Sequence, residues 1–171
     1  LSSEKEFNQI LNFHTESGYI KRGLTFGRLK KIRIDGFNMA KKFFKLIESL
    51  SNKTNLKIIV RPHPIDKLSN YNSLKRFKNV KVIKEGSLSE WIYHSKIVVH
   101  SSCTGGLEAS LRGRPTISYI PFNSVHGHKF ADKYSKKIKK FDECLDVIQK
   151  ITNNKKVKKV NSNEFKLRAY N

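Results

Sequence analysis

The chain has 171 residues, the size of one ordinary domain, and its 37% of hydrophobic residues are enough to form a packed core. Its 35 basic and 14 acidic residues give a formal net charge of +21, which attracts polyanions such as nucleic acid and anionic lipid. Short apolar stretches, a first segment without signal-peptide order and only two cysteines predict a protein of the reducing cytoplasm that neither spans a membrane nor relies on disulfides.

The basic residues are concentrated in two flanking segments. Nine lie within residues 21–45, which contain one acidic residue, and eleven lie within residues 128–160, which contain four. Residues 85–110 instead contain one lysine and three glutamates. Two explanations remain open: the flanks bind an anionic surface, or the whole chain is enriched in lysine, asparagine and isoleucine without a functional role.

Hydrophobic periodicity and turn residues predict alternating helices and strands from residue 37 onward. In chain order we expect a helix over residues 37–50, a strand over 57–60, a helix over 68–77, a strand over 80–83, a helix over 87–93, a strand over 97–99, a helix over 107–112, a strand over 116–120 and a helix over 142–151. Ser87 and Glu90 have the spacing of a capping box, and Gly113 suits the left-handed C-cap of a helix. Residues 1–35 show only a short helical spacing, between residues 7 and 13.

This alternation predicts the fold class: an α/β protein with a Rossmann-like parallel sheet flanked by helices. We expect residues 37–152 to form the Rossmann-like domain. Residues 1–36 would be an N-terminal segment or the remnant of an interdomain region, and residues 153–171 a basic tail or a returning helix. Ligands of open α/β sheets bind outside the carboxyl ends of the strands, so the residues that follow the strands are the candidates for a site.

The first candidate loop is the Arg-Pro-His-Pro sequence of residues 61–64, after the strand at 57–60. Two prolines hold His63 on a stiff turn, because each proline restricts the residue before it. Arg61 places a second cation beside this histidine. The alternative interpretation is a simple turn with a solvated imidazole.

The second candidate loop is the Ser-Ser-Cys-Thr-Gly-Gly sequence of residues 101–106, between a strand and a helix. Small side chains, hydroxyls and unpaired N–H groups at the positive end of a helix are typical of a phosphate site. The loop is neither a Walker A loop nor a Gly-x-Gly-x-x-Gly fingerprint. The alternative is a helix N-terminus capped by Ser or Thr for its own stability. Glu108, one turn into the helix, could bind a ribose or interact favourably with the helix dipole.

Four segments together resemble the nucleotide-binding half of GT-B glycosyltransferases: Ile-Ile-Val-Arg-Pro-His-Pro at 58–64, Glu-Trp-Ile at 90–92, the block at 98–109 and Gly-Arg-Pro-Thr-Ile-Ser-Tyr at 113–119. The nearest group is the bacterial surface-polysaccharide proteins related to capsule Kdo transferases. The resemblance covers about residues 37–122, and residues 98–119 are its most specific part. It departs from the family at Gly106, where a threonine or another small residue is expected, and the chain does not contain the N-terminal acceptor domain.

This resemblance implies one half of a GT-B fold that binds a cytidine nucleotide through a His-Pro pair and its phosphate through a Ser-Ser pair. The candidate nucleotide-binding residues are Arg61, His63, Pro64, Ser101, Ser102, Thr104, Gly105 and Glu108. Helix dipole, hydroxyls and a cation from His63 or Arg61 would neutralise the charge that develops on the leaving phosphate. The catalytic carboxylate would lie in the N-terminal GT-B half, so no catalytic residue is assigned here. No metal and no further cofactor are expected.

The predicted function is therefore the donor domain of a cytoplasmic glycosyltransferase of capsule or lipopolysaccharide biosynthesis. Its donor would be a CMP-linked sugar such as CMP-Kdo, its acceptor a lipid-linked or oligosaccharide chain, and its basic flanks would lie on the anionic inner face of the membrane. One alternative is a CDP-glycerol or polyol-phosphate transferase, which shares both residue pairs. Another is a non-enzymatic basic module that binds nucleic acid, but the aromatic residues are not interleaved with the basic ones and no such motif is present.

A few other residues carry weaker signals. His126 and His128 could ligate a metal or line the nucleotide cleft, but no third ligand is evident. Trp91 and His100 are expected to be core and sheet-end residues. Cys103 has no identifiable base, so we expect a small loop residue and not a nucleophile.

Overall fold

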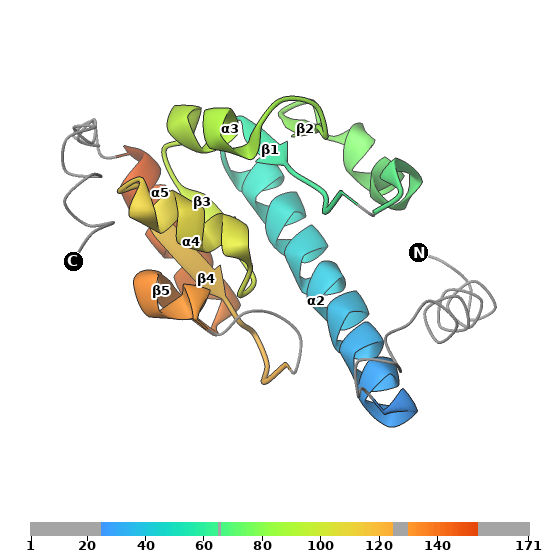
Figure 1. Ribbon diagram of the computed structural model, residues 1–171. Coiled ribbons are helices and arrows are strands. Elements are labelled where there is room, and N and C mark those ends of the chain that lie inside the picture. The colour runs from blue at the N-terminus through green and yellow to red at the C-terminus, as the bar shows by residue number, and fades with distance from the viewer. Residues whose placement is uncertain (1–24, 65, 125–129, 154–171) are drawn as a thin grey trace. The chain divides into compact units, whose positions relative to one another are not determined.

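The computed structural model describes residues 25–64, 66–124 and 130–153, which form helices and short parallel strands (Figure 1). It divides into two compact units, residues 1–84 and 85–171, each described by itself below. The range predicted as one Rossmann-like domain, 37–152, spans both units. The expectations for residues 7–13, for the basic tail after residue 153 and for the pair His126 and His128 lie outside the described residues.

The first unit contains a long helix followed by two short strands and a 3-10 helix. Its elements are α2 (Phe26–Lys53), β1 (Ile58–Val60), η2 (Leu68–Arg76) and β2 (Val80–Val82). The strands β1 and β2 pair in parallel, with Ile58 opposite Val80. The core of this unit joins the helix to the strands through three buried side chains, Ile47, Leu74 and Val80.

Helix α2 begins eleven residues before the predicted start at residue 37. Thr25 is its N-cap, and the Thr25 hydroxyl oxygen accepts a hydrogen bond from the Arg28 N–H at 3.3 Å. Such a cap satisfies one of the N–H groups that a helix start leaves without a partner. The prediction missed this start because the basic stretch before Phe37 shows no sustained apolar period.

The second unit contains a three-stranded parallel sheet with helices around it. Its elements are α3 (Leu88–His94), β3 (Val98–His100), α4 (Thr104–Leu111), β4 (Thr116–Tyr119), η3 (Ala131–Tyr134), β5 (Lys136–Ile138) and α5 (Phe141–Asn153). The strand order is β3-β4-β5, and all four residues of the central strand β4 are buried. In Figure 1, α4 lies in front of this sheet and α5 behind it, which accounts for that burial.

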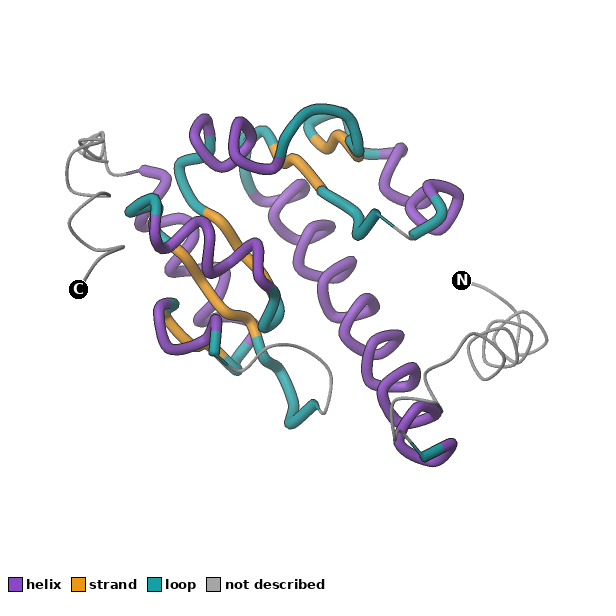
Figure 2. The backbone as a smooth tube through the Cα atoms, viewed as in Figure 1, coloured by secondary structure: helices purple, strands orange, loops and turns teal. Residues whose placement is uncertain are grey.

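The predicted fold class is confirmed: the protein is α/β, with short parallel sheets flanked by helices, as the distribution of helices and strands in Figure 2 shows. All four predicted strands are present, but they belong to a two-stranded and a three-stranded sheet. The fifth strand, β5, was not predicted, because two of its three residues are exposed lysines and only Ile138 is buried. Within the described part of the chain, no helix is both long and apolar enough to cross a bilayer.

Two local predictions about helix ends are confirmed. Ser87 and Glu90 form a complete capping box at the start of α3. Gly113, after α4, has a φ of 67°, in the left-handed region where glycine is favoured. Helix α4 itself begins at Thr104, three residues earlier than predicted, so Thr104 and Gly105 belong to its first turn.

Candidate functional site

The candidate site is centred on the connection between β3 and α4 in the second unit. Strand β3 ends at His100, and α4 starts at Thr104 after the N-cap residue Cys103, whose side chain makes no capping hydrogen bond. Among the described residues, the N–H groups of Thr104 and Gly105 have no acceptor. Because the partial positive charge of a helix lies at its N-terminus, these two groups can bind an anion.

The side chains around this helix start are accessible and polar. Thr104 and Cys103 are exposed, and Ser101 is partly exposed. Within the described chain, neither the Ser101 nor the Thr104 hydroxyl has a hydrogen-bond partner. Both hydroxyls can therefore donate to a ligand.

Ser102 has a different role from Ser101. Its side chain is buried, and its hydroxyl lies 2.9 Å and 2.8 Å from the two carboxylate oxygens of Asp132. A second buried hydroxyl, that of Ser118 on β4, donates to the same carboxylate at 2.5 Å. The Ser102 hydroxyl thus donates its hydrogen bond to Asp132. In this geometry Ser102 can donate to a phosphate through its backbone N–H, and its predicted role in binding remains a prediction.

The His100 side chain links the loop to Ser135 through hydrogen bonds of both ring nitrogens. Its Nδ1 accepts the Cys103 N–H at 3.3 Å, and its Nε2 lies 2.9 Å from the Ser135 hydroxyl. Because the Ser135 hydroxyl donates in turn to the Ala131 carbonyl, the imidazole is neutral with its proton on Nε2. Burial lowers the pKa of His100, and the Asp132 carboxylate opposes this shift. The expectation that His100 is a sheet-end residue is confirmed.

The position of this imidazole accounts for Gly106, where the sequence departs from the family that it resembles. A Cβ atom on Gly106 would lie 2.2 Å from Nε2 of His100, far inside van der Waals contact. Any side chain at residue 106 would displace the ring that holds the Cys103 N–H. The His100 ring therefore requires glycine there.

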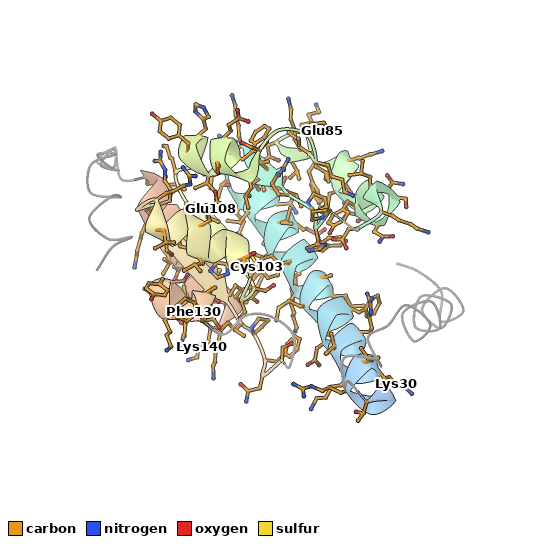
Figure 3. The ribbon with its side chains drawn as sticks, in the orientation of Figure 1. Lys30, Glu85, Cys103, Glu108, Phe130 and Lys140 are labelled. Atoms are coloured by element: carbon orange, nitrogen blue, oxygen red, sulfur yellow. The ribbon has the colours of Figure 1, made fainter. Side chains whose placement is uncertain are left out.

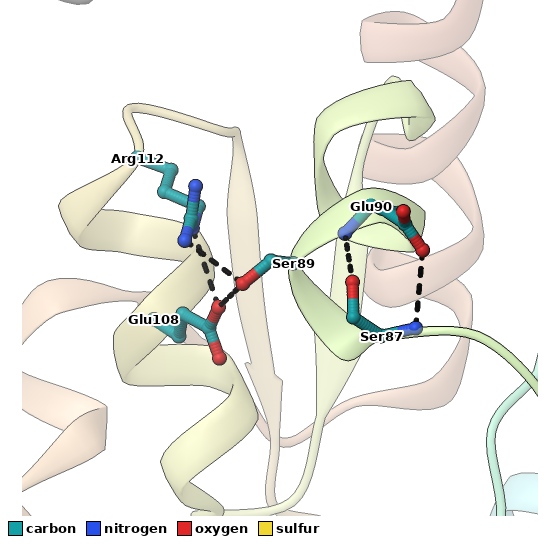
Figure 4. Close-up of polar contacts among 5 residues, drawn as sticks. All are labelled: Ser87, Ser89, Glu90, Glu108 and Arg112. Carbon is teal, nitrogen blue, oxygen red and sulfur yellow. Dashed lines mark hydrogen bonds and ion pairs between the residues drawn. The ribbon is translucent and has the colours of Figure 1, made fainter.

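Glu108 lies one turn into α4 and is already engaged by its neighbours (Figure 4). Its Oε1 accepts hydrogen bonds from the Ser89 hydroxyl at 2.5 Å and from the Arg112 Nε at 3.3 Å. Arg112 also donates to the Ser89 oxygen at 2.8 Å, so the three side chains form a closed network that joins α3 to α4. Binding of a ribose by Glu108 would have to share this carboxylate with Arg112.

The Arg-Pro-His-Pro loop follows β1 in the first unit. His63 is exposed, and its N–H donates to the carboxylate of Asp66 at 3.1 Å, which also accepts the Tyr71 hydroxyl at 2.7 Å. Lys84 donates to the Pro64 carbonyl at 2.8 Å. Burial and this carboxylate raise the pKa of Tyr71, so the phenol stays a donor. These bonds tie the loop to Asp66 and Lys84.

The predicted site residues thus fall into two groups. Ser101, Ser102, Thr104, Gly105 and Glu108 lie together around the start of α4 (Figure 3 labels Cys103 and Glu108). The other predicted residues, Arg61, His63 and Pro64, lie at the end of β1 in the other unit, where Arg61 donates to the Ile83 carbonyl at 3.2 Å.

Sequence reasoning missed Asp132, Ser118 and Ser135, which support the loop from outside it. The available signal was an isolated acid, Asp132, next to a small apolar residue within a lysine-rich segment. The indole N–H of Trp91, expected in the core, donates to the Glu85 carbonyl at 3.0 Å, and the residue is only half-buried.

Comparison with protein-family models, with curated proteins and with solved structures finds no match for this chain.

Proposed function

We propose that this chain binds the donor nucleotide of a glycosyltransferase, with the nucleotide phosphate at the start of α4. The observation that carries the proposal is the pair of N–H groups of Thr104 and Gly105, which have no acceptor among the described residues, next to the accessible hydroxyls of Ser101 and Thr104. These groups follow the carboxyl end of a parallel strand, the position at which α/β proteins bind ligands. A phosphate there interacts with hydrogen-bond donors and with the helix dipole at once.

The choice of nucleotide rests on the sequence resemblance and not on the geometry of the loop. The His-Pro pair at His63 and the Ser-Ser pair at Ser101 support a cytidine nucleotide, and a CMP-linked sugar such as CMP-Kdo is the proposed donor. The acceptor would be a lipid-linked or oligosaccharide chain of a bacterial capsule or lipopolysaccharide. The chain would neutralise the phosphate while an N-terminal GT-B half supplies the acceptor site and the catalytic carboxylate.

The exposed lysines near the C-terminal side of the second unit support a position on the anionic inner face of the membrane. One of them lies within η3 and four follow it, and the exposed aromatic side chains Phe130 and Tyr134 lie in the same segment. The lysines of this segment are Lys133, Lys136, Lys137, Lys139 and Lys140. The Phe130 and Tyr134 rings pack edge to face at 5.3 Å between centroids, and the Lys133 ammonium lies over the Phe130 ring. A Phe130 ring that contacts both Tyr134 and Lys133 has less surface left for stacking on a base, so this segment suits the membrane interface better than a single-stranded nucleic acid.

Calorimetric titration of the full chain with CMP, UMP and AMP tests the nucleotide assignment. We expect CMP to bind more tightly than the other two. Equal affinity for all three, or binding of none, would refute the cytidine assignment. Tighter binding of CDP-glycerol than of CMP-linked sugars would instead favour the polyol-phosphate alternative.

Substitution of the accessible hydroxyls of Ser101 and Thr104 tests whether the ligand lies at the loop. Ser101→Ala and Thr104→Val should each weaken CMP binding by about 1.5–3 kcal/mol, the usual loss for a hydrogen bond to a charged group. Ser73→Ala, an exposed serine on η2, is the matched control and should bind like the wild type. If the control and the loop variants bind equally well, the phosphate does not lie at the start of α4.

A further inference from the structure

A buried carboxylate lies beneath the candidate loop. Asp132 is only 5% exposed, and its carboxylate accepts hydrogen bonds from Ser102 and Ser118. Among the described residues, no lysine or arginine forms an ion pair with it. Burial of a carboxylate costs several kcal/mol and is often no better for stability than an apolar residue of the same size. A buried acid that is held by hydroxyls alone therefore suggests a role beyond stability.

The residue that Asp132 holds has an unusual backbone conformation. Ser102 has a φ of 50°, and among the described non-glycine residues it alone has a positive φ. The left-handed conformation is unfavourable for an L-residue, because Cβ approaches the following carbonyl oxygen. The hydrogen bond that the Ser102 hydroxyl donates to the Asp132 carboxylate, 2.9 Å and 2.8 Å from its two oxygens, offsets this cost. They fix the turn that leads from β3 into α4.

The segment around Asp132 supports the loop at two further points. The Ser135 hydroxyl lies 2.9 Å from Nε2 of His100, and the Ser110 hydroxyl donates to the Tyr134 carbonyl at 2.6 Å. His100 in turn holds the Cys103 N–H. Residues 131–135 thus fix the loop before, within and after the start of α4.

We propose that Asp132 is the positioning residue of the candidate loop: it holds Ser102 in the left-handed turn that leaves the Thr104 and Gly105 N–H groups free for a phosphate. This inference rests on the proposed function for its ligand, and it adds a residue on η3 that does not itself contact the nucleotide. The step that Asp132 controls is conformational, so its effect can be measured both with and without ligand.

Two substitutions at one residue separate the conformation from the hydroxyl. Ser102→Ala removes the hydroxyl and keeps the cost of a positive φ, whereas Ser102→Gly removes the hydroxyl and adopts that φ freely. We expect Ser102→Ala and Asp132→Asn each to lower CMP affinity at least tenfold. Ser102→Gly should bind within about threefold of the wild type, and it should restore binding in the double variant with Asp132→Asn. A residue that only stabilises the fold would not be rescued by a glycine thirty residues away.

Amide resonances of the uniformly labelled full chain give the readout that needs no ligand. In Asp132→Asn and Ser102→Ala, the amides of Cys103, Thr104 and Gly105 should shift, while in Ser102→Gly they should stay near their wild-type positions. Ser118→Ala is the matched control, because it removes the other hydroxyl on Asp132 without touching the loop. The amide resonances of Cys103, Thr104 and Gly105 should not shift in this variant.

The outcomes distinguish this inference from the proposed function. If the wild type binds no CMP, the proposed function fails, and unchanged loop amides in Asp132→Asn would overturn the positioning role as well. If Ser102→Gly binds as poorly as Ser102→Ala while its loop amides match the wild type, the hydroxyl itself contacts the ligand and Asp132 is not the positioning residue. Should Asp132→Asn not fold, the comparison of the two Ser102 variants decides.

Discussion

The contact between Gly106 and His100 gives a prediction whose magnitude follows from the structure. A Cβ on Gly106 would lie 2.2 Å from Nε2 of the His100 ring, and this ring is buried and hydrogen-bonded through both nitrogens. Gly106→Ala must therefore push the ring aside. Overpacking of a core costs about 1–3 kcal/mol, and two neutral hydrogen bonds contribute about 1 kcal/mol each.

We expect Gly106→Ala to lower the free energy of unfolding of the second unit by about 2–4 kcal/mol, the sum of these terms less about 1 kcal/mol by which alanine is favoured over glycine within α4. Urea denaturation followed by the fluorescence of Trp91, the single tryptophan and a residue of this unit, measures the loss. The double variant Gly106→Ala with His100→Ala should lose less than the sum of the single variants, because the clash no longer exists.

Gly36→Ala is the matched control. Gly36 lies within α2, and nothing approaches within 4 Å of a Cβ placed there. Alanine is favoured over glycine inside a helix by about 1 kcal/mol, so this variant should be slightly more stable than the wild type when α2 is followed by circular dichroism. Gly106→Ala with a stability within about 0.5 kcal/mol of the wild type, the usual range for substitutions that disturb nothing, would refute the packing argument.

Three further measurements test other features of the structure. First, a thiol reagent should modify the exposed Cys103 in the native protein and Cys144 only after unfolding, because burial makes Cys144 inaccessible and raises its pKa to about 12; rapid modification of both native thiols would contradict this. Bound CMP should slow the reaction of Cys103 if the phosphate lies at the start of α4. Second, burial lowers the pKa of His100 below its ordinary value near 6.5, so the unfolded chain takes up a proton there before the folded one does. The stability that neutral His100 contributes should be complete above pH 6.5 and decrease as the pH falls below it; equal pH dependence in the wild type and His100→Gln between pH 7.5 and 5.5 would contradict this. Third, vesicles of anionic phospholipid should bind the chain with about 1 kcal/mol from each lysine near the surface, and glutamine at Lys136, Lys137, Lys139 and Lys140 together should weaken binding. Salt should weaken vesicle binding much more than CMP binding, because the Debye screening length falls from about 10 Å at 0.1 M salt to about 3 Å at 1 M. Capture of single-stranded RNA in place of vesicles would favour the nucleic-acid alternative.

Local sequence patterns determined the secondary structure of most of the described chain. The β-branched residues of the segments 58–60, 80–82 and 98–100 and the capping box at Ser87 act over a few residues, so they can be recognised without knowledge of the fold. The alternation of these elements also determined the α/β class. The sequence likewise placed five candidate residues at one loop, because residues 101–108 are contiguous.

Only the tertiary structure decided what the residues of that loop do. Ser101 and Ser102 are adjacent and identical in type, yet the Ser101 hydroxyl is accessible whereas that of Ser102 is buried on Asp132. The deciding partner lies thirty residues along the chain and reaches the loop because β4 and η3 return beside β3. A hydrogen bond between residues so far apart leaves no periodic or spacing signal in the sequence, since it depends on how the strands and helices pack together.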